Sequence, residues 1–407
     1  MLGISFDKLF GNEKPTSFLV LDIGSDFVKA LIFELIEKED TAEKQLEVIG
    51  AGKVPQNLSD MQMGVVADIN AVAENVQKAL DEALLSCEIE PKSAVLGASG
   101  MLVEGMTTRV RLSRKNPDQE MNAKELNRLT KKIRDAAFIE AAEQIALSRG
   151  QSNLDIEIID SEITGMEVDG FPVSEPTGFK GARLDVSYFT SICVKNNLHV
   201  LESVVRAAGL KPVAVTSNLY ALLKALLIDR ESSEFSSLLI DVGGGTTDAA
   251  VVFSGSIVST ETLTVGGQDF TRALARENNL RFSDAETLKL KYSKGNLEAE
   301  KQQQVASVLD SILETWVLGI SEALDSMEAV EEFPNRVLLC GGGAQLPGLK
   351  TELNESLPQA VSFAEKPQVE LLTADAFDFF NDQTNKAVSA QWVPSLCLGY
   401  FYKSNLY

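Results

Sequence analysis

Histidine and cysteine are scarce in this sequence. Of 407 residues only His199 is a histidine, and the four cysteines are spread along the chain without any Cys-x-x-Cys pair. A single histidine argues against a Ser-His-Asp mechanism and against a multi-histidine metal site, and we expect it on the surface near a helix start. Scattered cysteines are typical of reduced thiols in a cytosolic protein, not of a disulfide framework or a zinc site.

Long apolar runs and excess positive charge are also missing. Nothing at the start of the chain resembles a signal peptide and no apolar run reaches about 18 residues, so we expect no membrane span. The 37 Lys and Arg against 59 Asp and Glu give a net charge of −22, which disfavours non-specific attraction to nucleic acid or to an anionic membrane. Residues 1–16 are expected to form an N-terminal tail, partly disordered or folded against the body.

One stretch carries most of the chemistry. Residues 238–253 run as an apolar strand to Asp241, then through three glycines, two threonines and a second acid into a β-branched returning strand. Glycines let backbone N–H groups approach an anion such as phosphate. Asp241 would repel bare phosphate, so its position indicates a Mg²⁺ ion between them; the alternative is a glycine-rich hairpin with a satisfied Asp. The predicted phosphate loop is Gly243, Gly244, Gly245, Thr246 and Thr247.

The same hairpin occurs near the start of the chain. Residues 18–33 align with the later stretch without a gap, which is an internal repeat. Two such loops facing each other could grip one polyphosphate from both sides. One matched position changes charge, so one loop offers a cation to phosphate and the other an acid for metal or water. The matched pairs are Asp22 with Asp241, Gly24 with Gly243, and Lys29 with Asp248.

Later segments are predicted to complete the site. A third apolar strand runs into three glycines, which could let a flat base and ribose lie against the backbone. An acid and a lysine at i and i+3 share one helix face and could reach ribose hydroxyls or the base edge; the alternative is a surface ion pair. A Gly-Gly turn is also predicted to contact the nucleotide. These residues are Gly266, Gly267, Glu286, Lys289, Gly341, Gly342 and Gly343.

The motifs, taken in order, resemble those of the ATPase superfamily of actin, heat-shock-70 proteins and sugar kinases. They are Asp-x-Gly-Ser ending at Ser25 with Lys29 after it, Asp-x-Gly-Gly-Gly-Thr-Thr-Asp, Ala-Glu-x-x-Lys and Gly-Gly-Gly. The resemblance covers nearly the whole chain. It implies an α/β, actin-like fold of two similar ribonuclease H-like domains closing over ATP and Mg²⁺, with Asp22 and Asp241 as the metal-binding and catalytic acids.

The order of predicted elements divides the chain. Residues 17–99 and 206–234 are expected to form the first actin-like domain, 235–375 the second, and 376–407 a segment returning to the first. Residues 100–205 are predicted to be an inserted α+β subdomain of the SHS2-like kind. Its expected elements, with the helix that follows, are a helix over 121–149, strands over 154–160, 161–168 and 184–194, and a helix over 197–208.

The insert narrows the resemblance to two bacterial families. Residues 169–185 resemble the Asp-Gly…Asn-Pro-x-Gly-x-x-Gly-x-Arg-Leu pattern of the FtsA cell-division family, with Glu175 where that pattern has Asn. Residues 208–215 and 396–403 look more like the PilM family of type IV pilus assembly. In both families the insert makes protein contacts. FtsA proteins end in an amphipathic membrane-binding helix that we do not expect here, which favours the PilM-like interpretation.

This resemblance implies an ATP-binding cytoplasmic scaffold at the inner face of the cell membrane, with pilus assembly as its first candidate process. Its partner would be the cytoplasmic tail of an inner-membrane protein or a division protein, and it could self-associate into dimers or filaments. An FtsA-like division role, a sugar kinase-type phosphotransferase and a chaperone-like ATPase are the alternatives. In the superfamily a Gln or Glu at a helix start positions the attacking water. Asn218 is the nearest candidate here, so we expect tight ATP binding with slow hydrolysis.

Overall fold

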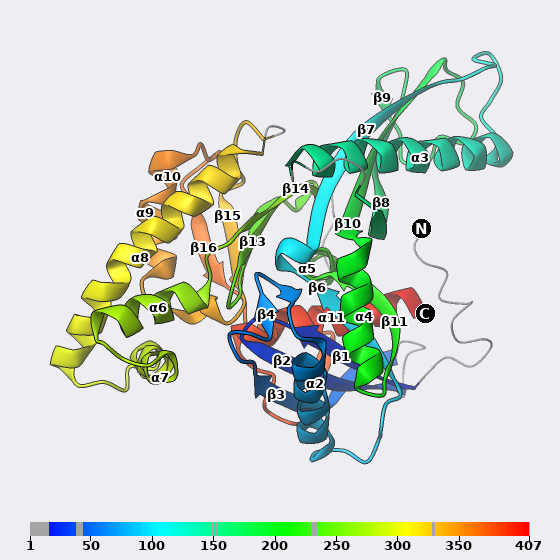
Figure 1. Cartoon of the computed structure of the whole chain (residues 1–407). Helices are drawn as coiled ribbons and strands as arrows, with labels where there is room; N and C mark the ends of the chain where they lie inside the picture. The colour runs from blue at the N-terminus through cyan, green and yellow to red at the C-terminus, as the bar shows by residue number, and fades with distance from the viewer. Residues whose placement is uncertain are drawn as a thin grey trace.

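A computed structural model describes residues 16–37, 44–148, 150, 154–228, 234–327 and 330–406. These residues form a six-stranded sheet, a nine-stranded sheet and a two-stranded ribbon. The two large sheets belong to separate lobes, and one end of the nine-stranded sheet extends away from both (Figure 1). Residues 1–15, most of the expected N-terminal tail, lie outside the described residues. No helix in the described part of the chain is long and apolar enough to cross a membrane.

The first sheet grows from the N-terminal hairpin. β1 pairs antiparallel with β2, which pairs antiparallel with β3, while β6 and β11 continue in parallel on the other side of β1. The apolar run of β1 is buried along nearly its whole length, as expected of a central strand with both faces covered. The strands are β1 (Ser17–Ile23), β2 (Phe27–Glu37), β3 (Lys44–Pro55), β6 (Ser93–Ala98), β11 (Lys211–Ser217) and β17 (Phe380–Asp382).

The second sheet repeats this topology. β12 pairs antiparallel with β13, β13 antiparallel with β14, and β15 and β16 continue in parallel on the other side of β12. The same arrangement in both halves confirms the duplicated α/β fold that the superfamily resemblance implies. The strands are β12 (Ser237–Val242), β13 (Thr247–Phe253), β14 (Ser256–Leu263), β15 (Arg336–Cys340) and β16 (Gln368–Leu371).

Helices cover one face of each sheet. α2 and α4 pack on the first sheet, where Gly52 lets α2 approach closely, because a Cβ there would lie 1.9 Å from the Ala79 carbonyl oxygen. Five helices share an apolar core with the second sheet. Exposed His199 lies on α4, as expected. The helices are α2 (Ile69–Leu84), α4 (Lys195–Ala207), α6 (Gly267–Glu277), α7 (Phe282–Ser293), α8 (Ala299–Asp325), α9 (Leu349–Glu355) and α10 (Leu357–Ala360).

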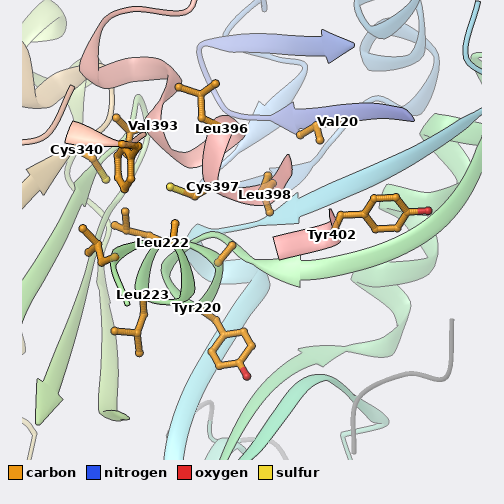
Figure 2. Packing of buried hydrophobic residues seen from close by; sticks show 14 of the residues in the cluster. Val20, Tyr220, Leu222, Leu223, Cys340, Val393, Leu396, Cys397, Leu398 and Tyr402 are labelled. Atoms are coloured by element: carbon orange, nitrogen blue, oxygen red, sulfur yellow. The ribbon is translucent and has the colours of Figure 1, made fainter. Parts of the chain in front are cut away.

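Two further helices, α5 (Asn218–Leu226) and α11 (Val393–Leu406), lie between the sheets. Their side chains form one apolar cluster with the inner faces of both sheets. Figure 2 shows Leu222 of α5 and Leu398 of α11 within this cluster, together with Val20 of the first sheet and Cys340 of the second. The two halves therefore share a hydrophobic layer, which we call the middle layer.

The inserted segment contains β7 (Val103–Ser113), α3 (Ala123–Ser148), β8 (Ile156–Val168), β9 (Phe171–Pro172) and β10 (Arg183–Val194). Its strands extend the second sheet beyond β14 in the order β7-β10-β8-β9, and α3 packs on one face. The β14–β7 junction is a single ladder pair, Ser259 with Met106. Short elements complete the chain: β4 (Met61–Gln62), β5 (Val65–Val66), η1 (Gly100–Leu102), η3 (Gly343–Gln345), η4 (Ala374–Ala376) and η5 (Ala390–Trp392).

The strand predictions within the insert were partly wrong. The strands expected over 154–160 and 161–168 are one continuous strand, β8, and β7 was not predicted at all. The sequence interpretation ended the first of these strands at Asp160. In the structure, buried Asp160 instead accepts hydrogen bonds from Thr216 and Ser217 of β11, so a polar residue continues the strand inside the protein.

Candidate nucleotide-binding cavity

The two repeated hairpins hold their matched residues at the same register. Asp22 lies opposite Lys29 across β1 and β2, and Asp241 lies opposite Asp248 across β12 and β13. Each aspartate that was matched in the sequence stands one residue before the end of its strand. The loop of each hairpin therefore begins directly beside an acid.

The two loops line one cavity of about 320 Å³, within the range of small-molecule sites, roughly 300–1,000 Å³. Residues from both sheets and from α5, α6 and α7 converge on it. The predicted site residues that line it are Asp22, Gly24, Ser25, Lys29, Asn218, Asp241, Gly243, Gly244, Gly245, Thr246, Asp248, Gly267, Glu286, Lys289, Gly341, Gly342 and Gly343.

Two predicted residues do not line the cavity. The buried Thr247 hydroxyl donates to the Val265 carbonyl at 2.8 Å and accepts the Trp316 indole N–H at 2.9 Å. Because successive strand side chains point to opposite faces, Thr247 turns toward α8 while Thr246 faces the cavity. Gly266 packs against the second loop, where a Cβ would lie 2.7 Å from the Gly244 carbonyl oxygen. Both residues therefore support the second loop on the side away from the cavity.

The two matched acids differ in their surroundings. Asp22 has partners: Lys29 Nζ lies 2.8 Å from its Oδ2, and the Ser395 hydroxyl donates to the same oxygen at 3.2 Å. Burial, and next the nearby charge of Asp248, raises the pKa of Asp241 to about 7, although Lys29 acts in the opposite direction. A cation beside Asp241 would stabilise its charged form.

The Asp248 side chain connects β13 to two other segments by hydrogen bonds. Its Oδ2 accepts the Gly100 amide at 2.8 Å and its Oδ1 accepts the Thr262 hydroxyl at 2.7 Å. Burial raises the pKa of this carboxyl despite both hydrogen bonds. The expected acid for metal or water therefore already links the second hairpin to the start of the insert.

The acids fit a metal ion only if phosphate shares it. Within the described ranges no group of three or more His, Cys, Asp or Glu could hold a metal ion. Mg²⁺ usually keeps several waters and takes one or two carboxylates plus phosphate oxygens. Asp241, with Asp22 nearby in the same cavity, meets that smaller requirement. The site suits a cation that arrives with a phosphate ligand.

Several loop amides are free to receive such a ligand. The backbone N–H groups of Ser25, Asp26, Gly244 and Gly245 donate no hydrogen bond to any residue that the structure describes. Successive backbone amides in a turn form anion-binding concavities. The two hairpin tips thus present donors from both halves to the same cavity.

An ion pair and two apolar side chains form another part of the cavity wall. Lys289 Nζ lies 2.8 Å from Glu286 Oε2 and also donates to the Gly267 carbonyl at 2.8 Å. The side chain of Lys289 is only 10% exposed, so this is not a surface ion pair. Phe270 and Leu346 add apolar surface. The pair can thus face a ligand from within the cavity wall.

The three glycines after β15 are not equivalent. Gly341 has φ of +90°, and a Cβ there would lie 2.3 Å from Asp241 Oδ1. The Asp241 carboxylate therefore occupies the space that a side chain at this position would need. At Gly343 a Cβ would lie 2.6 Å from Val242 Cγ1. At Gly342 the nearest atom, Gln391 Cβ, is 3.8 Å away. Only Gly342 leaves room for a flat group against the backbone.

Asn218 brings an amide to the cavity wall. It is the first residue of α5, is 3% exposed, and its Oδ1 has no hydrogen-bond partner among the described residues. A buried polar atom without a partner costs free energy. This oxygen packs against Gly97, where a Cβ would lie only 2.2 Å from it.

Sequence reasoning missed Lys53, Asp26 and Gln391, which also line the cavity. Lys53 Nζ lies 2.5 Å from Gln391 Oε1 and 3.7 Å from the centroid of the Phe27 ring. Burial, and next the charge of Lys29, lowers the pKa of Lys53 to about 8. Lys53 lies opposite Lys29 across β2 and β3, so strand register was the signal that could have found it.

Comparisons with known proteins agree with this architecture. A family model described as cell division protein FtsA matches residues 238–377. The FtsA protein of Pseudomonas aeruginosa is 30% identical over 275 residues, which cover 67% of this chain and 60% of that protein. The FtsA protein of Bacillus subtilis is 25% identical over 369 residues, which cover 85% of this chain and 78% of that protein. A chain of the PilM-PilN type IV pilus biogenesis complex superposes with a TM-score of 0.66 at 19% identity. The superposition covers 96% of this chain and 98% of that chain.

The duplicated sheets and the cleft between their hairpins define an actin-like two-domain protein. Within that class, the chain belongs to the PilM/FtsA family of the actin-like ATPase superfamily.

Proposed function

We propose that the protein binds ATP together with Mg²⁺ in this cavity. The observation that carries the proposal is the pairing of two acid-tipped hairpins, one from each sheet, on a single cavity. The free loop amides and Lys29 would bind the phosphates, because both are donors to an anion. Glu286 and Lys289 would face the ribose, and the base would lie over Gly342.

The chemistry we propose is slow hydrolysis. Mg²⁺, held through Asp241 and Asp22 and shared with the phosphates, would neutralise charge on the phosphate oxygens. Asn218 would orient an attacking water through its side-chain amide. An amide does not take up a proton at neutral pH, so Asn218 cannot act as a general base, and bound ATP would persist. The nucleotide would then mainly hold the two halves in one arrangement.

ATP binding is tested on purified protein by titration with Mg·ATP, Mg·ADP and adenosine, followed by heat of binding and by thermal unfolding. A ligand of the folded state raises stability by about 2.7 kcal/mol at one hundred times its Kd. We expect stabilisation by Mg·ATP and its loss in Asp241→Asn, with Asp284→Asn, an exposed carboxylate on α7, as the matched control. A folded protein that no nucleotide stabilises would contradict the proposal.

We further propose that the protein is a scaffold that recruits membrane proteins by their cytoplasmic tails, first of all in type IV pilus assembly. Support comes from the superposition on the PilM chain, which covers nearly the whole of both chains. The protein would then act in the cytoplasm at the inner face of the membrane, with the insert contacting partners, and could form dimers or filaments. The domain bounds expected from the sequence are retained as part of this proposal.

A second candidate is an FtsA-like role in cell division, linking a tubulin-like ring to the membrane. The family model and the curated relatives favour it, since both carry the FtsA description. Pull-downs with the purified, ATP-loaded protein distinguish the two roles. Capture of the cytoplasmic tail of a pilus inner-membrane protein would support the first, and capture of a tubulin-like division protein would support the second and refute the first.

A further inference from the structure

Asp26 reaches from the tip of the first hairpin to the second half of the molecule. Its three carboxyl atoms lie within 2.5 Å of where a Cβ on Gly244 would stand, so the carboxyl group rests on the Gly244 backbone. Gln268, on the first turn of α6, donates from Nε2 to Asp26 Oδ1 at 2.6 Å and to the Ser25 carbonyl at 3.4 Å. The contact crosses the cleft between the two phosphate-type loops.

The surroundings of this carboxyl group act on its charge in both directions. Burial is the largest influence on this carboxyl group and raises its pKa, while the hydrogen bond from Gln268 and the charges of Lys289 and Lys53 favour the charged form and Glu286 opposes it. Lys289 is already bound to Glu286 and to the Gly267 carbonyl. A phosphate entering between the hairpin tips would meet the Asp26 side chain beside Gly244 in either protonation state. Where the carboxyl group is ionised, charge repulsion adds to this, and in a partly desolvated space that repulsion is stronger than in water.

We propose that Asp26 is a built-in competitor of the nucleotide phosphates. Its carboxyl group occupies part of the space between the loop amides of the two hairpins, and its hydrogen bond to Gln268 holds the two hairpin tips together. Nucleotide binds only after Asp26 has moved aside, so this residue sets a lower affinity than the loops alone would give. The inference rests on the proposed ATP site and names the residue that limits its affinity.

Two variants separate charge from hydrogen bonding. Asp26→Asn keeps an oxygen that can accept the Gln268 amide and removes the negative charge, whereas Asp26→Ser removes the charge and shortens the side chain so that its oxygen no longer reaches Gln268. Asp284→Asn changes the net charge of the chain equally but lies outside the cavity, where it is exposed and paired with Arg281. Dissociation constants for Mg·ATP, Mg·ADP and adenosine are measured by calorimetry on the full chain.

We expect both Asp26 variants to bind Mg·ATP and Mg·ADP about tenfold tighter or more, the size of effect that one unpaired charge has at close range. Adenosine, which lacks phosphates, should bind the wild type and both variants equally, and Asp284→Asn should match the wild type. Unchanged or weaker Mg·ATP binding in both Asp26 variants overturns the inference, and weaker binding would mark Asp26 as a ligand of the cation instead.

The outcome also separates this inference from the proposed function. Nucleotide binding by the wild type without any gain in the variants refutes only the role of Asp26. Failure of all four proteins to bind nucleotide refutes the ATP site itself. Hydrogen exchange without nucleotide gives an independent check: the Gly243–Thr246 amides should exchange faster in Asp26→Ser than in Asp26→Asn, and equal rates would contradict the closing contact.

Discussion

Asn218 offers only an amide at the position where the superfamily resemblance leads us to expect a Gln or Glu. Its Oδ1 is buried without a hydrogen-bond partner among the described residues, and the residue lines the cavity. We expect Asn218→Ala to lower the already slow rate of ATP hydrolysis by about tenfold or more, as loss of a group that positions a reactant does, while the Kd for Mg·ATP changes little. Single-turnover hydrolysis and equilibrium binding measure the two effects separately.

The control for this variant is Asn354→Ala, a partly exposed asparagine on α9. It should keep wild-type turnover. Fast hydrolysis in the wild type that Asn218→Ala leaves unchanged would show that Asn218 has no part in the reaction.

Asp160 predicts a pH dependence of stability. Burial raises its pKa from 3.8 to about 6, against the opposing hydrogen bonds from Thr216 and Ser217. An acid whose folded-state pKa is raised stabilises the fold fully below its unfolded pKa, and this contribution is lost as pH rises through about 6. Relative to Asp160→Asn, the wild type should therefore have a larger free energy of unfolding at pH 5 than at pH 8, by about 1–1.5 kcal/mol.

Urea unfolding of both proteins at the two pH values measures this difference. Asp155→Asn, which removes an exposed acid just before β8, should track the wild type at both. An offset between wild type and Asp160→Asn that is the same at pH 5 and pH 8 would contradict the raised pKa.

At the scale of elements, the insert is attached to the second sheet mainly by side chains. The ladder between β7 and β14 has one pair, and the Thr260 hydroxyl accepts the Gly105 amide at 2.7 Å and donates to the Gly105 carbonyl at 3.0 Å. Thr260→Val removes both bonds at nearly constant volume. We expect a loss of about 1–3 kcal/mol in the free energy of unfolding and faster amide exchange along β7.

Urea unfolding and hydrogen exchange measure these effects. Thr287→Val, an equivalent change on an exposed turn of α7, is the control and should alter neither. Wild-type protection of β7 in Thr260→Val would show that the single ladder pair suffices to hold the insert.

Sequence reasoning succeeded where chemistry repeats and failed where it depends on distant contacts. The alignment of Asp22 with Asp241 was enough to predict two equivalent hairpins, because strand pairing preserves the register of a repeat. Thr247 was misplaced because the alternation within β13 was not applied to it. Asp26 could not be assigned from sequence, since its partner Gln268 lies 242 residues away and meets it only across the folded cleft.

At the scale of the whole molecule, the middle layer connects both sheets to the cavity. Leu398 of α11 is fully buried in it, and its Cδ1 lies 2.7 Å from where a Cβ on Gly97 would stand, beside Asn218 Oδ1 at 2.2 Å. Ser395 on the same helix donates to Asp22. A change in α11 packing should therefore reach the nucleotide site, whereas an equal change in a core confined to the second half should not.

Leu398→Ala and Leu309→Ala test this coupling, because each truncates a buried leucine side chain. Leu309 lies on α8 and belongs to the core that is confined to the second half. Both should lower the free energy of unfolding by about 2–5 kcal/mol, measured by urea unfolding. Only Leu398→Ala should also weaken Mg·ATP binding at a temperature where both variants remain folded. Equal Mg·ATP affinities in the two variants would mean that the shared layer holds the halves together without transmitting its packing to the cleft.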